Sequence, residues 1–274
     1  MVTSVLPRFR GFSTLEVLMR IKSLGLAAVF FLTLSVCGST HAQVAGHIES
    51  MKLLTTDTGW AATRNKLFWT TDGGASWKDI TPNTARGRTI TSATFSDQSH
   101  GWVLLAHRRG DDPQTGFGKS LFELARTADA GTSWSVKELT VPNPDPNRGF
   151  SEQTWLDFVD ALHGWALLRA NGNTAMGGGA LATTDDGGAS WKALGVPAAG
   201  PIHFVTVMDG WLDAEANGEA GPGLYVTRNG GNDWEYVSLN PPPSFGAKVY
   251  PTYELPEFAD KDAGSMLVTF AQTE

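Results

Sequence analysis

The pattern of apolar and polar positions divides the chain into one continuous apolar run and a long body of short segments. The apolar run covers residues 24–36. In the body, no stretch sustains the period of 3.6 residues that marks an amphipathic helix. Short apolar segments there are bounded by glycine-rich turns, which is typical of β-strands. The body is therefore predicted to be all-β.

One seven-residue motif recurs four times in this body. Its copies are Thr71-Asp72-Gly73-Gly74-Ala75-Ser76-Trp77, Ala128-Asp129-Ala130-Gly131-Thr132-Ser133-Trp134, Asp185-Asp186-Gly187-Gly188-Ala189-Ser190-Trp191 and Arg228-Asn229-Gly230-Gly231-Asn232-Asp233-Trp234. An Asp or Asn side chain can accept hydrogen bonds from nearby backbone N–H groups, and glycine supplies the positive φ that a tight turn needs. Four copies in equivalent turns favour a structural role over catalysis or metal binding. The expected structural residues are Asp72, Gly74, Trp77, Asp129, Gly131, Trp134, Asp186, Gly188, Trp191, Asn229, Gly231 and Trp234.

A second motif alternates with the first. Its clearest copies are Phe95-Ser96-Asp97-Gln98-Ser99-His100-Gly101-Trp102 and Phe158-Val159-Asp160-Ala161-Leu162-His163-Gly164-Trp165. Weaker copies cover residues 53–60 and 204–211, and a fifth starts at Phe258 with Ser265 in place of the tryptophan. Because His100 and His163 occupy the same place in successive repeats, we interpret them as turn residues and not as catalytic ones.

The repeat length identifies the architecture. Successive Gly-Trp tryptophans are 42, 63 and 46 residues apart. A period near 40–45 residues suits a four-stranded β-propeller blade, and the longer repeat then carries an insertion. In one repeat the predicted strands are residues 89–96, 102–107, 120–127 and 134–141, with the Gly-Trp motif as the first turn and the Asp motif as the third.

Both recurring turns lie on one face of such a propeller, because consecutive strands are antiparallel. The opposite face then carries the loops of variable length, predicted at residues 108–119, 142–154, 170–179, 215–223 and 241–255. Binding residues often lie on such loops, and arginine and aromatic side chains are typical interface anchors. The candidate binding residues are Arg108, Arg109, Arg148, Phe150, Trp155 and Tyr250. The alternative is that Trp155 packs in the core and that the arginines are solvated surface.

The repeats predict about four and a half blades and hence an incomplete propeller. The first blade is expected to begin with a strand at residues 47–54. The last repeat stops after a turn at residues 258–264 and a strand at 266–270. Residues 43–46 are too few to supply two missing strands, because each needs about five residues. We therefore expect a domain over residues 43–274 that is truncated at its C-terminus.

The N-terminal run has the form of a secretory signal peptide. Arg20 and Lys22 precede it, and small and polar residues follow it up to Ala42. Residues 1–42 are therefore interpreted as a signal peptide, and the mature chain is expected in the periplasm or outside the cell. The alternative is a lipoprotein anchored at Cys37, although Val36 stands where a lipoprotein normally has a small residue.

Charge and cysteine content narrow the possible partners of the mature chain. Loss of residues 1–42 removes four basic side chains and one acidic one, which leaves 17 basic, 27 acidic and a net charge of −10. Such a surface repels phosphate backbones and anionic lipids, so nucleic acid is not an expected partner. Cys37 is the only cysteine, so thiolate metal sites are excluded after cleavage. No cofactor, metal or membrane span is expected in the mature chain.

The Asp motifs resemble the BNR or Asp-box repeats of sialidase-like propellers. Their alternation with the Phe-x-Asp-x-x-x-Gly-Trp motif resembles the photosystem II stability and assembly factor type of propeller, over about residues 48–265. Members of that family from photosynthetic organisms assist photosystem II assembly. The resemblance therefore implies an exported, non-catalytic scaffold that binds a protein or a glycan.

A carbohydrate-active enzyme is the alternative function, since Asp-box propellers include sialidases and xyloglucan-cleaving hydrolases. The Arg-Ile-Pro segment that usually supplies the first sialidase arginine is absent from this sequence. Glycoside hydrolysis otherwise needs two carboxyl groups across a sugar. Acidic residues of the predicted loops are Asp111, Asp112, Asp145, Glu152 and Glu215. No spacing among them singles out a pair, so no catalytic residue is predicted.

Overall fold

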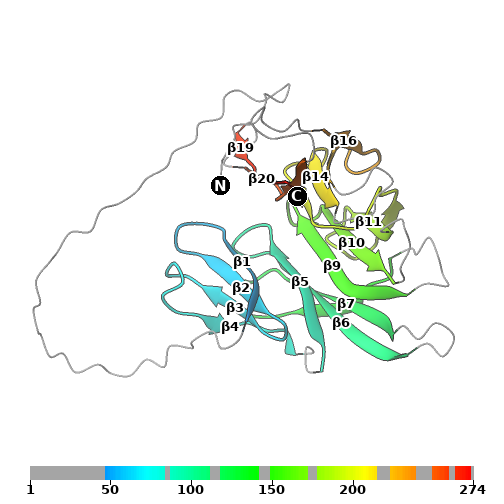
Figure 1. Cartoon of the computed structure of the whole chain (residues 1–274). Helices are drawn as coiled ribbons and strands as arrows, with labels where there is room; N and C mark the ends of the chain where they lie inside the picture. Colours follow the sequence, from blue (N-terminus) through cyan, green and yellow to red (C-terminus); the bar gives the residue numbers. More distant parts are fainter. Residues whose placement is uncertain are drawn as a thin grey trace, which may run out of the picture.

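The computed structural model describes residues 47–83, 87–111, 118–141, 149–171, 178–214, 223–238, 249–258 and 263–272. For strand residues 108–111, 118–119, 249–250 and 271–272 only the backbone is described. The described residues form β-strands joined by turns, with no α-helix among them (Figure 1). In these same ranges there is also no helix long and apolar enough to cross a bilayer.

Four antiparallel sheets follow one another along the chain, each a meander in which every strand pairs with its sequence neighbour. Blade 1 consists of β1 (Ile48–Leu53), β2 (Gly59–Thr63), β3 (Leu67–Thr70) and β4 (Lys78–Asp79). Blade 2 consists of β5 (Thr89–Phe95), β6 (Gly101–Asp111), β7 (Gly118–Thr127) and β8 (Ser135–Glu138). Blade 3 consists of β9 (Phe150–Phe158), β10 (Gly164–Ala170), β11 (Gly179–Thr184) and β12 (Lys192–Leu194). Blade 4 consists of β13 (Ile202–Phe204), β14 (Gly210–Ala214), β15 (Gly223–Thr227) and β16 (Glu235–Val237).

A hairpin with the form of half a fifth blade follows. Strand β17 (Val249–Tyr253) pairs with β20 (Val268–Gln272), and β18 (Glu257–Phe258) pairs with β19 (Gly264–Ser265). Within the described ranges no sheet joins this hairpin to blade 1, so the blades form an open arc (Figure 1). The predicted fold class, an all-β propeller of four-stranded blades with about four and a half blades present, is confirmed.

Several predicted loops are wrong at their ends, because strands continue into them. Strand β6 extends to Asp111 and β7 starts at Gly118, where residues 108–119 were expected to form a loop. Strand β9 starts at Phe150 and β17 at Val249, inside the predicted loops 142–154 and 241–255. Antiparallel pairing continues for as long as each backbone N–H finds a partner. The arginines and other polar side chains at these strand ends hid the alternation that sequence reasoning relies on.

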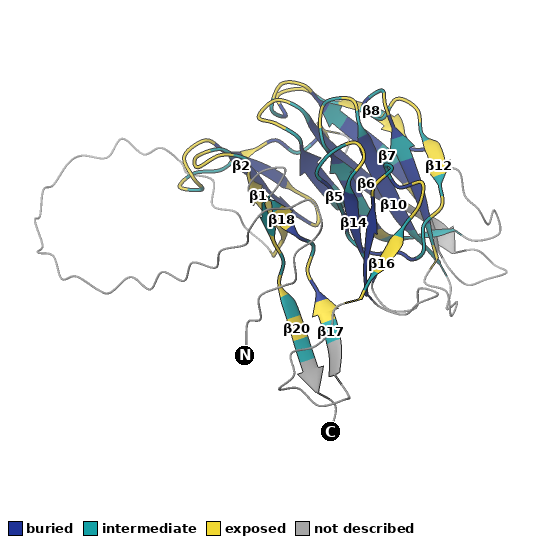
Figure 2. Ribbon diagram, turned by 90° about the horizontal axis from the view of Figure 1, so that it is seen from above, coloured by how far each residue is buried: buried dark blue, intermediate teal, exposed yellow. Residues whose placement is uncertain are grey.

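Three aromatic rings hold each seam between neighbouring blades. Trp102 of blade 2 stacks on Phe158 of blade 3 with ring centroids 3.8 Å apart, and the edge of Trp191 meets the same phenylalanine at 6.2 Å. The seam between blades 3 and 4 repeats this arrangement with Trp165, Phe204 and Trp234. Figure 2 shows the buried residues concentrated in the strands and the exposed ones in the turns. The two recurring motifs therefore supply the core between the blades.

Glycine precedes Trp102, Trp165 and Trp211 because a phenylalanine ring occupies the space that a Cβ atom would need. A Cβ atom at Gly210 would lie 2.5 Å from the ring of Phe204, far inside normal contact distance. The rings of Phe95 and Phe158 cover Gly101 and Gly164 in the same way. The Phe and Gly-Trp positions of the motif are thus coupled by close packing rather than by turn conformation.

Indole N–H groups add hydrogen bonds across the seams. Trp102 Nε1 donates to the carbonyl oxygen of Gly187 in the next blade at 3.0 Å, and Trp165 Nε1 donates to that of Gly230 at 3.0 Å. Trp60 Nε1, the equivalent donor of blade 1, is buried with no partner among the described residues. Ala130 stands at the place of Gly187 and Gly230, and its carbonyl oxygen accepts no hydrogen bond from Trp60.

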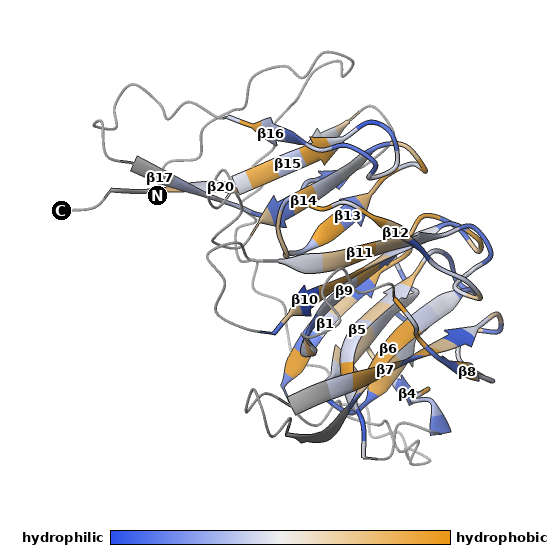
Figure 3. Ribbon diagram, turned by 90° about the vertical axis from the view of Figure 1, so that its right-hand side faces the viewer, coloured by the Kyte–Doolittle hydropathy of each residue, from blue (hydrophilic) through white to orange (hydrophobic). Residues whose placement is uncertain are grey.

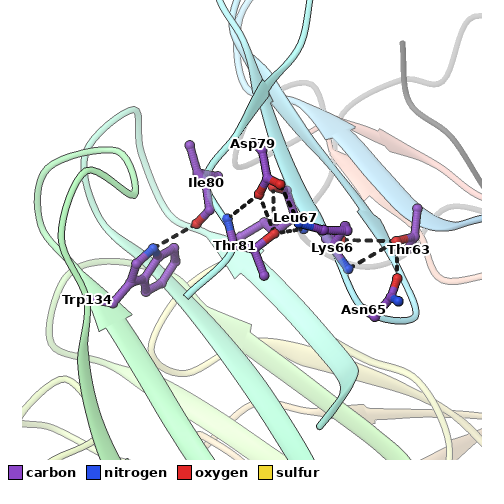
Figure 4. Close-up of polar contacts among 8 residues, drawn as sticks. All are labelled: Thr63, Asn65, Lys66, Leu67, Asp79, Ile80, Thr81 and Trp134. Atoms are coloured by element: carbon purple, nitrogen blue, oxygen red, sulfur yellow. Dashed lines mark hydrogen bonds and ion pairs between the residues drawn. The ribbon is translucent and has the colours of Figure 1, made fainter. Parts of the chain in front are cut away.

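Blades 1 and 2 are also joined by a hydrogen bond whose donor lies in the later blade and whose acceptor follows β4, the last strand of blade 1. Trp134 Nε1 of blade 2 donates to the carbonyl oxygen of Ile80 at 2.8 Å (Figure 4). Just before Ile80, the Asp79 carboxylate accepts hydrogen bonds from Lys66 Nζ and from the Thr81 N–H at 2.6 and 2.9 Å. These contacts fix the direction in which the chain leaves β4 and enters the next blade.

Candidate functional site

The molecule has two opposite faces of different character. The first and third turns of every blade lie on one side, which we call the turn face, and the remaining connections lie on the other, the loop face. Figure 3 shows the turns as a largely hydrophilic border along one side of the stacked blades. The first and third turns of all four blades lie within the described residues.

Each Asp turn is closed by a buried threonine together with the aspartate. The Thr127 hydroxyl accepts the Gly131 N–H at 2.9 Å and donates to Asp129 Oδ1 at 2.7 Å. Asp129 Oδ1 also accepts the Ser133 N–H at 2.8 Å, and Oδ2 accepts the Ser133 hydroxyl at 2.6 Å. The same contacts surround Asp72 and Asp186. Both carboxylate oxygens are thus occupied as acceptors inside the turn.

The fourth turn has the same hydrogen-bond network, but its carboxylate belongs to a different position of the motif. Asn229 Oδ1 accepts the Asp233 N–H at 2.9 Å, and Asn229 Nδ2 donates to Asp233 Oδ2 at 2.8 Å. Asp233 replaces the serine of the other three turns, so the carboxylate and its polar partner have exchanged places. Hydrogen-bond geometry, and not a carboxylate at one fixed position, is the feature common to the four turns.

The turn carboxylates are held ionised by their hydrogen bonds. The hydroxyl and the N–H of Ser76 lower the pKa of Asp72 to about 2, and those of Ser133 lower the pKa of Asp129 to about 2. The equivalent bonds from Ser190 lower the pKa of Asp186. A general acid in glycoside hydrolysis needs the opposite shift, a raised carboxyl pKa. These three groups are suited to holding turns and not to donating protons.

His100 and His163 lie in matching first turns of blades 2 and 3. His100 Nδ1 lies 2.8 Å from Asp97 Oδ2, while Asp97 Oδ1 accepts the N–H groups of Ser99 and His100. Asp160 makes the same contacts with His163. Burial acts to raise the pKa of Asp97 and Asp160, but these backbone and histidine hydrogen bonds outweigh it, so both pKa values are lowered.

On the loop face, the predicted binding residues do not all fall where sequence reasoning put them. Arg108 and Arg109 lie in strand β6 opposite Ser120 and Lys119, and Tyr250 lies in β17 opposite Ala271, so none of the three is in a loop. The side chains of these three residues are outside the described part of the chain, as is the whole of Arg148. Phe150 opens β9 and packs half-buried against the core, with its ring 6.5 Å from that of Phe122.

Among the predicted binding residues, Trp155 has both apolar and cationic neighbours in the described structure. It lies in β9, half-buried, and packs against the apolar cluster between blades 3 and 4. The guanidinium of Arg169 lies over its ring, 5.5 Å from the centroid, and donates to the carbonyl oxygen of Ala199 at 3.5 Å. Trp155 therefore combines core packing with an arginine contact, and both interpretations of this residue hold in part.

An irregularity in strand pairing lies beside this pair. Thr154 is opposite Leu168 and Phe150 is opposite Ala170, so three residues of β9 face the single residue Arg169. Bulges of this kind re-aim side chains and are common next to functional sites. Glu152, within the bulge, forms an ion pair with Arg64 of blade 1 at 3.1 Å. A second ion pair joins Arg88 and Glu123, with Nη2 and Oε1 2.7 Å apart.

The other acidic residues considered for catalysis form no described pair. Asp112, Asp145 and Glu215 lie outside the described residues, and only the backbone of Asp111 is described. Within the described ranges no group of three or more His, Cys, Asp and Glu side chains is arranged to hold a metal ion. The described loop face thus offers an aromatic-arginine pair and ion pairs.

Sequence reasoning missed a contact between the inner strands of blades 3 and 4. Asp157 Oδ2 accepts the Phe204 N–H at 2.6 Å and lies 3.2 Å from His203 Nδ1. Both residues directly precede the motif phenylalanine in their repeats, so aligning the repeats one position further back would have paired them. Arg169 carried no such signal, because nothing in the sequence places it over Trp155.

Neither a model of any protein family nor a curated protein matches the sequence. Among solved structures, the chain is similar to YCF48 bound to a D1 peptide, with 19% identity over 55% of this chain and 40% of that chain and a TM-score of 0.36. It is similar to YCF48 from Cyanidioschyzon merolae at 14% identity, 76% and 62% coverage and a TM-score of 0.39. It is also similar to an ancestral GH74 enzyme at 15% identity, 83% and 30% coverage and a TM-score of 0.47. The chain spans less than two thirds of the length of each of these proteins, and the likeness assigns neither activity nor partner.

Proposed function

We propose that this chain is an exported, non-catalytic β-propeller that binds a protein partner through its loop face. The observation that carries the proposal is the half-buried Trp155 under the guanidinium of Arg169, next to the bulge in β9. Tryptophan and arginine contribute most binding energy per residue at protein interfaces, and they do so from partly enclosed positions. Arg108, Arg109, Arg148, Phe150 and Tyr250 are proposed as further contact residues.

The carboxylates of the described residues support a binding role. All those with a shifted pKa are shifted downward and accept hydrogen bonds from their own turn or from a neighbouring side chain. Glu152, the one described side chain among the acidic residues of the loop face considered above, is paired with Arg64. These carboxylates are arranged to stabilise the blades.

Quantitative affinity capture tests the proposal. The tagged mature chain is incubated with periplasm or culture medium of the source organism, and bound proteins are compared among variants. Arg169→Gln and Trp155→Leu should lose a partner that the wild type retains. The control is Met51→Ser, which changes an exposed side chain on β1. A wild-type capture profile unchanged in both loop-face variants would contradict the proposal.

A glycan is the second candidate ligand, because a partly exposed tryptophan also provides a stacking platform for a sugar ring. A glycan array with the wild type and Trp155→Leu separates this ligand from a protein. We expect no turnover of chromogenic glycosides, sialosides or xyloglucan by the pure protein. If the pure protein hydrolysed one of these substrates, and substitution of one loop-face carboxylate abolished the activity, the protein would be a glycoside hydrolase and not a scaffold.

A further inference from the structure

One residue in each first turn makes the same backbone contact in all four blades. The carbonyl oxygens of Asp57, Ser99, Leu162 and Met208 accept the N–H of the residue that directly follows the Asp or Asn of the Asp turn, at 2.7–3.0 Å. The contact joins the two turns of a blade, and it uses no side-chain atom. Aspartate, serine, leucine and methionine all serve, so the fold does not dictate the side chain at this place.

In blades 3 and 4 that side chain is apolar and faces solvent. Leu162 and Met208 are each 50% exposed, and the adjacent Val207 is 41% exposed. Blade 2 has Gln98 and Ser99 at the places of Val207 and Met208. Turn tips normally carry polar residues, because these can satisfy the local backbone and water. Since the backbone contact is made whatever the side chain, the fold does not require apolar residues at these places.

The two apolar turns are neighbours in the molecule. Gly230 links them, because its N–H donates to the Met208 carbonyl oxygen at 2.8 Å and its own carbonyl oxygen accepts Trp165 Nε1 at 3.0 Å. Trp165 follows Leu162 by only three residues. Leu162, Val207 and Met208 together are called the apolar turn patch.

Carboxylates surround the apolar turn patch. The turns of blades 3 and 4 carry Asp160, Asp185, Asp186, Asp209 and Asp233. Two arginines reach these turns: Arg228 pairs with Asp209 at 3.1 Å, and Arg126 of blade 2 donates to the carbonyl oxygens of Ala161 and Asp186 at 3.5 Å. Hydrogen bonds keep the pKa of Asp160 and of Asp186 low, so both remain charged in mildly acidic surroundings. The five aspartates outnumber these two arginines, so a ligand that matches this surface carries positive charge together with apolar groups.

We propose that the apolar turn patch is a docking surface for a polypeptide segment in which lysine or arginine alternates with aliphatic or aromatic side chains. The apolar side chains of the segment cover Leu162, Val207 and Met208, and its cations face the surrounding aspartates. Anionic lipid and nucleic acid are repelled by the same aspartates. The surface lies opposite the loop face, so a partner here and a partner at Trp155 can bind together.

The test uses residues that the fold already accepts in blade 2. Leu162→Ser, Val207→Gln and Met208→Ser are combined in one variant, which gives both turns side chains found at Gln98 and Ser99. The probe is a short fluorescent peptide of leucine and lysine, with matched peptides in which serine replaces leucine or glutamate replaces lysine. Binding is measured by fluorescence anisotropy at low and high salt.

The wild type should bind the leucine–lysine peptide about tenfold more tightly than the triple variant, at equal melting temperatures. Serine–lysine and glutamate–leucine peptides should bind weakly to both proteins. Gln98→Ala/Ser99→Ala, on the same face of blade 2, is the matched control and should bind as the wild type does. Equal binding by the wild type and the triple variant would overturn the inference. Trp155→Leu should leave this binding unchanged, so the two proposed surfaces fail or succeed separately.

Discussion

At the scale of single residues, the threonine that opens each Asp turn performs more of the structural work than the sequence motif suggested. Thr127 is buried, and its hydroxyl serves both the turn backbone and the aspartate. The aspartate itself is exposed, and its oxygens bond mainly within the turn. The buried hydroxyl is therefore the more costly group to remove, because its loss leaves a buried N–H without an acceptor.

Thr127→Val should lower the free energy of unfolding by roughly 1–3 kcal/mol, the cost of leaving the buried Gly131 N–H unsatisfied. Thr127→Ser keeps the hydroxyl and should recover most of this loss. Urea unfolding followed by tryptophan fluorescence measures both variants. Thr132→Val, at an exposed position in the same turn, is the control and should be close to neutral. Equal effects of the substitutions at positions 127 and 132 would contradict the claim that the Thr127 hydroxyl stabilises the turn.

Ala130 occupies a backbone conformation that the other blades give to glycine. It is the one non-glycine residue with positive φ in the described ranges, at 56°, whereas Gly73, Gly187 and Gly230 hold the equivalent places. The strain of about 1–2 kcal/mol exceeds the entropic cost of a glycine, about 0.5–1 kcal/mol. Ala130→Gly should therefore raise the urea midpoint, and Ala128→Gly in the same turn should not. A lower midpoint for Ala130→Gly would show that the strain is relieved elsewhere.

At the scale of elements, the blades adhere through one repeated group of aromatic rings. Each phenylalanine that ends an inner strand lies between the Gly-Trp tryptophan of the preceding blade and the Asp-turn tryptophan of its own blade. The seam between blades 1 and 2 is built differently: the Trp60 and Phe95 centroids are 6.3 Å apart, Trp69 lies 4.8 Å from Phe95, and Trp134 in place of Trp60 donates the indole hydrogen bond, to Ile80. Each of the three seams therefore has one indole hydrogen bond among the described residues.

Phe158→Ala should cost roughly 3–5 kcal/mol, because it removes the central ring of the seam between blades 2 and 3. Phe158→Leu, which copies Leu53 at the equivalent place of blade 1, should cost less. Denaturant unfolding gives the free energies, and near-ultraviolet circular dichroism reports the loss of the Trp102 stacking signal. Phe150→Leu, at the half-buried start of the same strand, provides the comparison. A cost for Phe158→Ala no larger than that for Phe150→Leu would contradict the seam description.

At the scale of the whole molecule, the turn carboxylates link stability to acidity. The pKa values of Asp72 and Asp129 are about 2 in the folded state, against 3.8 for an unperturbed aspartate. Groups with a lowered folded pKa stabilise the fold above the unfolded value and lose that contribution as the pH falls through the folded value. The linkage therefore acts between about pH 5 and pH 2 and not near neutrality.

The melting temperature should accordingly be flat near neutral pH and fall as the pH drops from about 5 to about 2. Asp186→Asn removes one titrating group while retaining an acceptor, as Asn229 does in blade 4. In thermal scans at several pH values, the melting temperature of this variant should fall less than that of the wild type between about pH 5 and pH 2. If the melting temperatures of both proteins fell equally, the pH dependence of stability would come from other carboxylates.

Export is the second prediction at this scale, and it rests on the N-terminal sequence alone. N-terminal sequencing of the secreted protein should find Gln43 or a near neighbour as the first residue, because Ala42 ends the small and polar stretch after the apolar run. Cys37→Ser should be exported and released in the same way. A lipid-modified Cys37 at the N-terminus would instead place the protein on a membrane anchor.

The repeats determined much of this protein by themselves. Strand alternation, Gly-Trp spacing and the four Asp turns predicted blades, their order and the turn positions, because these features depend on contacts close in sequence. The start of the first strand near residue 47 and a turn at residues 258–264 followed from the same periodicity, whereas the strand that starts at Val249 was predicted as loop. Strand ends on the loop face could not be predicted, since polar residues that continue a strand, such as Arg108, carry no apolar signal.

Only the tertiary structure decided which distant residues meet. Trp155 and Arg169 belong to different strands, and their contact depends on a bulge that no turn residue marks. Arg64 and Glu152 come from blades 1 and 3, and Asp157 and His203 from blades 3 and 4. Contacts of this kind are set by how twisted sheets pack around an axis, a global property that local sequence patterns do not encode. The repeats therefore specified the scaffold, and the packing of the blades decided its surfaces.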